Sequence, residues 1–89
     1  KDRPLYFKAL DPYPQLLRNV DVAKGTVIDG AFMEDLVTRG EKLLAGAGRV
    51  LIRPSGTEPL LRVLVEAKDQ VVMENVSQVL VNAVQERYR

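Results

Sequence analysis

The 89-residue sequence predicts an α+β fold, a two-layer sandwich in which two helices cover one face of a small, mostly antiparallel sheet. Residues 48–66 alternate apolar and charged side chains on both sides of a turn-rich loop, which is typical of a β-hairpin. Apolar residues recur at steps of three and four in residues 30–45 and 70–87, which predicts two amphipathic helices. With an alternating stretch at residues 13–22, the expected order is strand, helix, strand, strand, helix.

The composition limits the classes of function. With 46% hydrophobic and 28% charged residues, the chain resembles one small soluble globular domain. It has no cysteine, which excludes a disulfide framework, and no histidine, which removes the commonest general base and metal ligand. The net charge of +1 and the 6% aromatic content argue against nucleic acid or a membrane surface as a partner. No apolar run is long enough to cross a bilayer and no signal peptide is visible, so we expect a cytoplasmic protein.

Residues 1–12 are interpreted as an extended lead-in or interdomain linker, and residues 13–89 as the domain itself. The lead-in mixes charges, aromatic residues and prolines, and its Leu5, Tyr6 and Phe7 can dock on the domain. The alternative is a partly ordered tail, because chain termini are often loose. Since the chain begins with lysine rather than methionine, we expect a fragment of a longer protein.

Residues 13–22 form the first predicted strand. Leu16, Val20 and Val22 share one face, and Arg18 interrupts that apolar face. A loop follows from residue 23 to residue 30, and it contains a short β-like piece at residues 26–28.

The first predicted helix covers residues 30–45. Asp29 is a suitable N-cap, and Gly46 and Gly48 are expected to end the helix. A glycine inside a helix costs up to about 1 kcal/mol relative to alanine. Gly40 lies near the apolar stripe, so we expect a close approach between this helix and the sheet there. The predicted apolar stripe is Phe32, Met33, Leu36, Val37, Gly40, Leu43 and Leu44.

The second predicted helix runs from Gln70 to about Arg87, with Asp69 as its cap. Its many valines lower the intrinsic helix propensity, because β-branched side chains lose rotamer freedom in a helix. We therefore expect tertiary packing to hold it. The predicted inward stripe is Val72, Met73, Val76, Val79, Leu80, Ala83 and Val84.

One register of the hairpin sets apolar residues opposite apolar residues. In it, Val50 faces Val65 and Ile52 faces Val63 on the side turned to the helices. A slip by one residue would set apolar residues opposite charged ones. On the other side of the hairpin the expected pairs are Arg49–Glu66, Leu51–Leu64 and Arg53–Arg62.

The pair Arg53 and Arg62 is the first sign of a binding site. Like charges directly opposite each other in a sheet are destabilising, and an anion between them would relieve the repulsion. Arginine side chains form charge-assisted and often bidentate hydrogen bonds with phosphate oxygens. The mouth of the hairpin loop is therefore a candidate anion site.

The loop at residues 54–59 has the chemistry of a phosphate cradle. Ser55 and Thr57 offer hydroxyl groups, and Gly56 is expected to let the backbone turn so that several N–H groups point one way. Pro54 and Pro59 bracket the loop and stiffen it, because proline fixes φ.

Glu58 does not fit an anion site in an obvious way. It can accept a hydrogen bond from a sugar hydroxyl or amine, or it can pair with Arg62. The alternative for the whole loop is an ordinary solvated hairpin turn, because the same residue types are common turn formers. The loop chemistry alone does not choose between these interpretations.

The residues from Arg53 to Val63, followed by Val65 and Glu66, resemble the C-terminal phosphate-binding loop of the α-D-phosphohexomutases. Residues 13–20 are similar to the segment that opens the same domain. Within the superfamily the chain most resembles the phosphoglucosamine mutase branch. Phosphoglucomutases also carry the Ser-Gly-Thr-Glu-Pro motif, so the same domain of a phosphoglucomutase or phosphomannomutase is the near alternative. A free-standing anion- or nucleic-acid-binding module is the alternative from another class.

The resemblance implies a role in an isomerase. Phosphoglucosamine mutases are four-domain enzymes that interconvert glucosamine 6-phosphate and glucosamine 1-phosphate, with a phosphoserine and Mg2+ held by earlier domains. The last domain holds the phosphate that is not transferred and moves as a lid. The implied partners are the phosphosugar and the preceding domains. This fragment is then expected to hold no catalytic residue and no metal, and to be inactive alone. Carried over by position, the phosphate ligands are Arg53, Ser55, Gly56, Thr57 and Arg62, with Glu58 as a candidate sugar contact.

Overall fold

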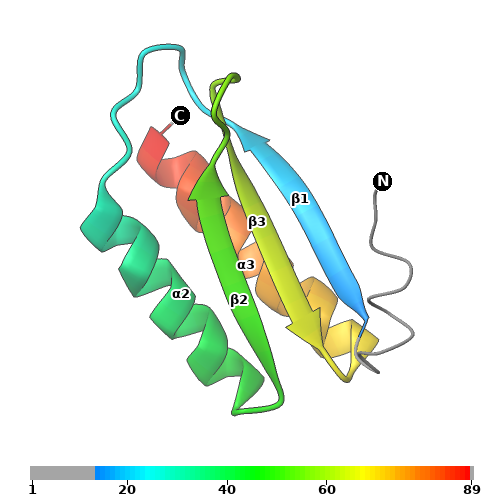
Figure 1. The fold of residues 1–89 in the computed structure, drawn as a ribbon. Helices are drawn as coiled ribbons and strands as arrows, with labels where there is room; N and C mark the ends of the chain where they lie inside the picture. The colour runs from blue at the N-terminus through cyan, green and yellow to red at the C-terminus, as the bar shows by residue number, and fades with distance from the viewer. Residues whose placement is uncertain (1–13, 89) are drawn as a thin grey trace.

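The computed structural model describes residues 14–88 and confirms the predicted α+β architecture. The lead-in, with Leu5, Tyr6 and Phe7, and the predicted strand start at residue 13 lie outside the described residues. The elements in chain order are β1 (Gln15–Asp21), α2 (Gly30–Leu44), β2 (Gly48–Pro54), β3 (Leu60–Ala67) and α3 (Gln70–Tyr88) (Figure 1).

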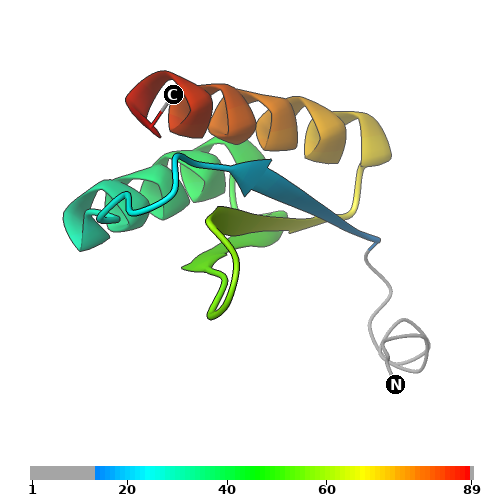
Figure 2. The same cartoon turned by 90° about the horizontal axis from the view of Figure 1, so that it is seen from above.

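The three strands form one antiparallel sheet in the order β1-β3-β2. Both helices lie on the same face of this sheet, as the view from above shows (Figure 2). α2 packs on β2, α3 packs on β3 and β1, and the two helices contact each other. Within residues 14–88, no helix lies on the other face of the sheet, and we call it the open face.

The hairpin register is the predicted one. Val50 pairs with Val65 and Ile52 with Val63, and these four residues are buried beneath the helices. β3 is the central strand, so it also pairs with β1, where Val20 lies opposite Leu61. The hydrophobic core consists of Val20, Leu36, Leu44, Val50, Ile52, Leu61, Val63, Val65, Ala67, Met73, Val76, Leu80, Val81 and Val84.

The N-cap of α2 is the predicted residue, and its C-cap is not. Asp29 is the N-cap, and its side chain accepts a hydrogen bond from the Ala31 amide at 2.9 Å. The predicted glycine stop is wrong in detail, because the left-handed C-cap is Ala45, with φ 54°. Its amide donates to the carbonyl oxygens of Glu41 and Lys42 and so satisfies the last turn. The predicted β-like piece at residues 26–28 forms no strand.

At Gly40, α2 approaches the sheet closely, as predicted. A Cβ atom at this position would lie 2.7 Å from Cγ2 of Val50 and 3.1 Å from Cδ1 of Leu80. The absence of a side chain therefore lets α2, β2 and α3 meet at one point in the core.

The predicted helix stripes need two corrections. Leu43 on α2 is 49% exposed and Val79 on α3 is 41% exposed, so neither belongs to the core. Ser77 and Val81 are buried in their place. α3 lies over two strands and against α2, and the face that meets all three is Met73, Val76, Ser77, Leu80, Val81 and Val84.

Candidate functional site

The loop end of the β2–β3 hairpin brings two arginines together on the open face. Arg53 and Arg62 are cross-strand partners, and both side chains are exposed. Within residues 14–88, no carboxylate lies within ion-pair distance of either guanidinium group. The structure therefore confirms the predicted like-charge pair and places no described acidic group against it.

Backbone hydrogen bonds hold the hairpin loop in a defined shape. The Ser55 amide donates to the Leu60 carbonyl oxygen at 3.0 Å, and the Leu60 amide donates to that of Glu58 at 2.8 Å, which closes the loop. Inside this frame, the amides of Thr57 and Glu58 both point at the hydroxyl oxygen of Ser55, at 3.4 and 3.3 Å. These two distances are long for N–H···O bonds, and a negatively charged oxygen is a stronger acceptor than a hydroxyl. The two amides converge on one point, which is the geometry that an anionic oxygen would need in order to accept from both.

Gly56 contributes open space at the tip of the loop and not an unusual backbone conformation. Its φ is outside the left-handed region, so this turn does not require the conformational freedom that we expected of the glycine. A Cβ atom at this position would meet nothing within 4 Å. The missing side chain leaves the tip of the loop open to a ligand that approaches the neighbouring amides.

The structure decides one of the two expectations for Glu58. Glu58 forms no ion pair with Arg62, so the predicted internal pairing is wrong. The carboxylate is exposed and lines a hollow beside the loop. Contact with a sugar hydroxyl or amine stays a prediction.

Sequence reasoning missed the segment at residues 22–29, which lies beside the hairpin loop. The amide of Val22 donates to the carbonyl oxygen of Pro59 at 2.8 Å. The two segments share a hollow of about 120 Å³. The bond joins backbone groups, so no side-chain type signals it. The lining residues are Val22, Ala23, Gly25, Thr26, Ile28, Pro54, Ser55, Glu58, Pro59 and Leu60.

The far end of the 22–29 segment is anchored to the end of α3. The Asp29 amide donates to the Tyr88 hydroxyl at 2.9 Å, and the Asp29 carboxylate pairs with Arg87 at 3.2 Å. The Arg87 guanidinium also lies 5.0 Å from the centre of the Phe32 ring, and the Phe32 and Tyr88 rings pack edge to face. The segment that supports the hairpin loop is therefore fixed at both ends.

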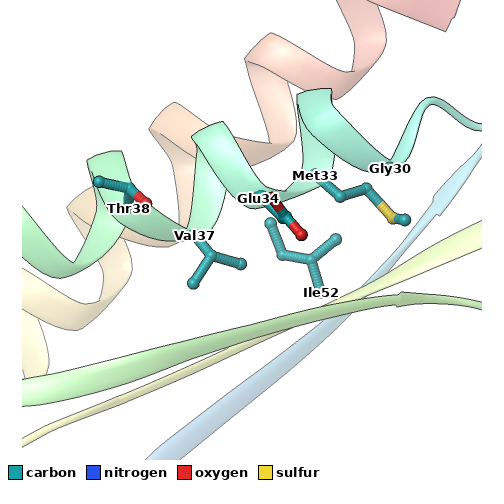
Figure 3. A pocket seen from close by; sticks show the side chains of 6 residues that line it. All are labelled: Gly30, Met33, Glu34, Val37, Thr38 and Ile52. Atoms are coloured by element: carbon teal, nitrogen blue, oxygen red, sulfur yellow. The ribbon is translucent and has the colours of Figure 1, made fainter.

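A larger hollow between α2 and the edge strand β2 has a different character. Its volume is about 490 Å³, and Met33 and Val37 of α2 lie across it from Ile52 of β2 (Figure 3). Its remaining lining residues are Gly30, Glu34 and Thr38, so its charged group is a carboxylate. This hollow is unsuited to an anion, and the donors of the hairpin loop remain the better candidate.

The loop end gathers groups whose chemistry suits an anion. Two guanidinium groups, two hydroxyls and two converging amides are hydrogen-bond donors in one small region. In residues 14–88, no three histidine, cysteine, aspartate or glutamate side chains gather closely enough to hold a metal ion. None of the helices in this part of the chain has the length and apolarity that a membrane crossing requires.

Residues 12–83 match the family model of the phosphoglucomutase/phosphomannomutase C-terminal domain. The chain belongs to this family. It is 45% identical over 73 residues to a phosphoglucosamine mutase of Rhodopseudomonas palustris (strain HaA2), an alignment that covers 82% of this chain and 16% of the relative. It is 44% identical over 80 residues to the phosphoglucosamine mutase of Alkalilimnicola ehrlichii, covering 89% of this chain and 18% of the relative.

Solved structures of phosphohexomutases share the fold. The Aspergillus fumigatus N-acetylphosphoglucosamine mutase, in complex with GlcNAc-6P and magnesium, superposes with a TM-score of 0.64 at 26% identity, over 86% of this chain and 16% of that one. An N-acetylglucosamine-phosphate mutase in its product complex gives a TM-score of 0.61 at 31% identity, over 81% and 15% of the two chains. The family resemblance seen in the sequence is confirmed. The chain spans less than a fifth of the length of these relatives.

Proposed function

We propose that this chain is the substrate-phosphate-binding C-terminal domain of a phosphoglucosamine mutase. In this proposal the parent enzyme interconverts glucosamine 6-phosphate and glucosamine 1-phosphate, and the domain holds the phosphate that is not being transferred. The observation that carries the proposal is the cross-strand pair Arg53–Arg62, which lies beside two amides that converge on the Ser55 hydroxyl. The names of the relatives support the sugar class.

Each predicted ligand has a chemical role in the proposed site. Arg53 and Arg62 supply charge and bidentate hydrogen bonds to phosphate oxygens. The hydroxyls of Ser55 and Thr57 add neutral donors, and Gly56 leaves room for the phosphate to reach the loop amides. Because all these groups recognise phosphate, the site accepts the substrate in either orientation.

The proposed contribution to catalysis is positioning. Binding energy from a phosphate that does not react can hold the reacting end of the sugar in place. In this proposal the Mg2+ and the phosphoserine belong to the preceding part of the polypeptide, as the family resemblance implies. The Aspergillus relative was solved with magnesium, which supports the same requirement in the full enzyme.

The test compares Arg53→Ala and Arg62→Ala with the control Arg39→Ala in the full-length enzyme. Arg39 is an exposed arginine on α2, and its side chain lies 3.8 Å from Asp35. A hydrogen bond to a charged group contributes about 1.5–3 kcal/mol, so each site variant is expected to lose roughly 10- to 150-fold in affinity for glucosamine 6-phosphate and in kcat/KM. Arg39→Ala is expected to behave as wild type.

Unchanged kcat/KM in both site variants would overturn the phosphate-binding role. The sugar is tested separately, by comparing kcat/KM of the wild-type enzyme for glucosamine, glucose and mannose phosphates. A clear preference for glucose or mannose phosphate would assign the chain to a phosphoglucomutase or phosphomannomutase. The site variants would then lose activity toward that substrate instead.

A further inference from the structure

The open face of the sheet is organised in three rows that each cross all three strands. The pairing of β1, β3 and β2 fixes which side chains share a row. From the start of β1 toward the hairpin loop, the rows are a polar row (Gln15, Glu66, Arg49), a leucine row (Leu17, Leu64, Leu51) and a cationic row (Asn19, Arg62, Arg53).

The leucine row is an apolar strip that no described element covers. Leu17 is 54% exposed and Leu51 is 45% exposed, with Leu64 half-buried between them on the central strand. A single exposed leucine is ordinary, but a contiguous apolar strip marks a contact surface. A hollow of about 220 Å³ next to Leu51 and Leu64 is large enough to receive a side chain from a partner.

The polar row borders the leucine row, and its buried carboxylate already has hydrogen-bond partners. Glu66 is only 5% exposed, and its two carboxylate oxygens accept hydrogen bonds from Arg49 at 2.8 Å and from Gln15 at 3.1 Å. A partner that covers this border therefore does not strand an unpaired carboxylate, which would be costly to bury.

We propose that the leucine row docks on an apolar surface of the preceding part of the same polypeptide. The chain matches the C-terminal domain of its family and covers 16–18% of the bacterial relatives, so most of each relative precedes this domain. The described chain enters the sheet at Pro14, whose carbonyl oxygen accepts a hydrogen bond from the Ala67 amide beside the polar row. A preceding domain is thus tethered at the corner of the open face, which raises its effective concentration there.

The docking surface is continuous with the proposed phosphate site. The cationic row lies directly next to the leucine row on the same face, so a domain that covers the leucines comes alongside Arg53 and Arg62. This part of the inference rests on the proposed function. The bound phosphosugar then lies between the two parts of the protein.

The test measures thiol accessibility in the full-length protein, with any cysteines of the preceding part replaced by serine. This chain has no cysteine of its own, so single cysteines can be introduced cleanly. Leu17→Cys and Leu51→Cys report the leucine row, and Leu43→Cys on α2 is the matched control at 49% exposure. Maleimide labelling rates are normalised to those of the urea-unfolded proteins. We expect the two row cysteines to react at least tenfold more slowly than the control.

Equal normalised rates at all three positions would overturn the docking proposal, and would leave the row free in the purified protein. Protection that rises with protein concentration, together with a doubled mass in sedimentation, would assign the face to a second copy and also overturn it. The labelling is repeated in an Arg53→Ala/Arg62→Ala background. Protection that persists there without phosphosugar binding supports docking independently of the site. If the single-cysteine proteins bind phosphosugar but their row cysteines are not protected, the docking proposal is overturned and the proposed function stands.

Discussion

The two ends of the β2–β3 hairpin are built from the same residue type and behave differently. Arg49 and Arg53 lie on the same face of β2, but β3 sets Glu66 opposite the first and Arg62 opposite the second. The Arg49 end is neutralised within the sheet by a 2.8 Å ion pair. The loop end keeps a like-charge pair, which typically costs a few tenths to 1 kcal/mol. The comparison teaches that one strand pair neutralises its charge at one end and, among residues 14–88, leaves two cations without a carboxylate partner at the other.

The largest loss of stability is expected in the buried middle of the hairpin, which supports both of its ends. Val63 is fully buried on the core face, opposite Ile52 and between the two ends. Val63→Asp buries an unpaired carboxylate and should destabilise the domain by about 4–5 kcal/mol or more, enough to unfold it. Thermal melts followed by circular dichroism check this, with the exposed position Val79→Asp as the control. A native-like cooperative melt for Val63→Asp would show that the hairpin faces are inverted.

A charge reversal can make the loop end resemble the other end. Arg62→Glu places a carboxylate opposite Arg53, so we expect the free energy of unfolding to stay equal or rise by about 0.2–1 kcal/mol. Affinity for glucosamine 6-phosphate in the full-length enzyme should fall more than about 100-fold, because one donor is lost and a repulsive charge is added. Calorimetric titration and a thermal melt measure the two quantities. Retained affinity would mean that the arginine pair is not the binding element.

The two glycines of the hairpin separate structure from binding. A Cβ atom at Gly48 would lie 2.1 Å from the Glu66 carbonyl oxygen, so Gly48→Ala must shift the backbone and should cost about 1–3 kcal/mol of stability. Gly56→Ala meets open space and should change stability by less than about 0.5 kcal/mol, while it weakens phosphosugar binding. Denaturant melts and titration of both variants give the comparison. An equal loss of stability in Gly48→Ala and Gly56→Ala would contradict the different roles of the two glycines.

The smallest effect on phosphosugar binding is expected at the end of the hairpin where Glu66 pairs with Arg49. Glu66→Gln removes the charge from the carboxylate that links Gln15 and Arg49, but keeps its shape and one acceptor. Stability should fall by about 0.5–1.5 kcal/mol, the usual worth of a hydrogen bond, and phosphosugar affinity should stay unchanged. Urea titrations of wild type and variant measure the first, and calorimetry the second. A large drop in affinity would show that the two ends are coupled.

The hairpin could be predicted from the sequence because one register satisfied two independent demands. It placed Val50, Ile52, Val63 and Val65 on a single face, and it set Arg49 against Glu66. The helix faces were harder, because α3 carries apolar residues on most of its circumference. Periodicity counted Val79 as inward and treated Ser77 as a gap. Only the positions of β1, β3 and α2 around α3 select the buried face.

The candidate site was predictable in its side chains and not in its backbone. Arg53, Arg62 and the loop hydroxyls could be named from residue type and spacing. The convergence of two amides on Ser55 depends on loop geometry, and the support from Val22 depends on strand order, which no single residue encodes. Gly56 was expected to shape the turn, and the structure shows that it leaves open space instead.

The bond between the Val22 amide and the Pro59 carbonyl oxygen has a kinematic consequence. It ties the tip of the hairpin to the segment that leads into α2, and Asp29 ties that segment to the end of α3. The loop cannot swing as a flap on its own hinge without breaking these bonds. Any movement of the loop that keeps these bonds therefore has to carry residues 22–29 and the end of α3 with it.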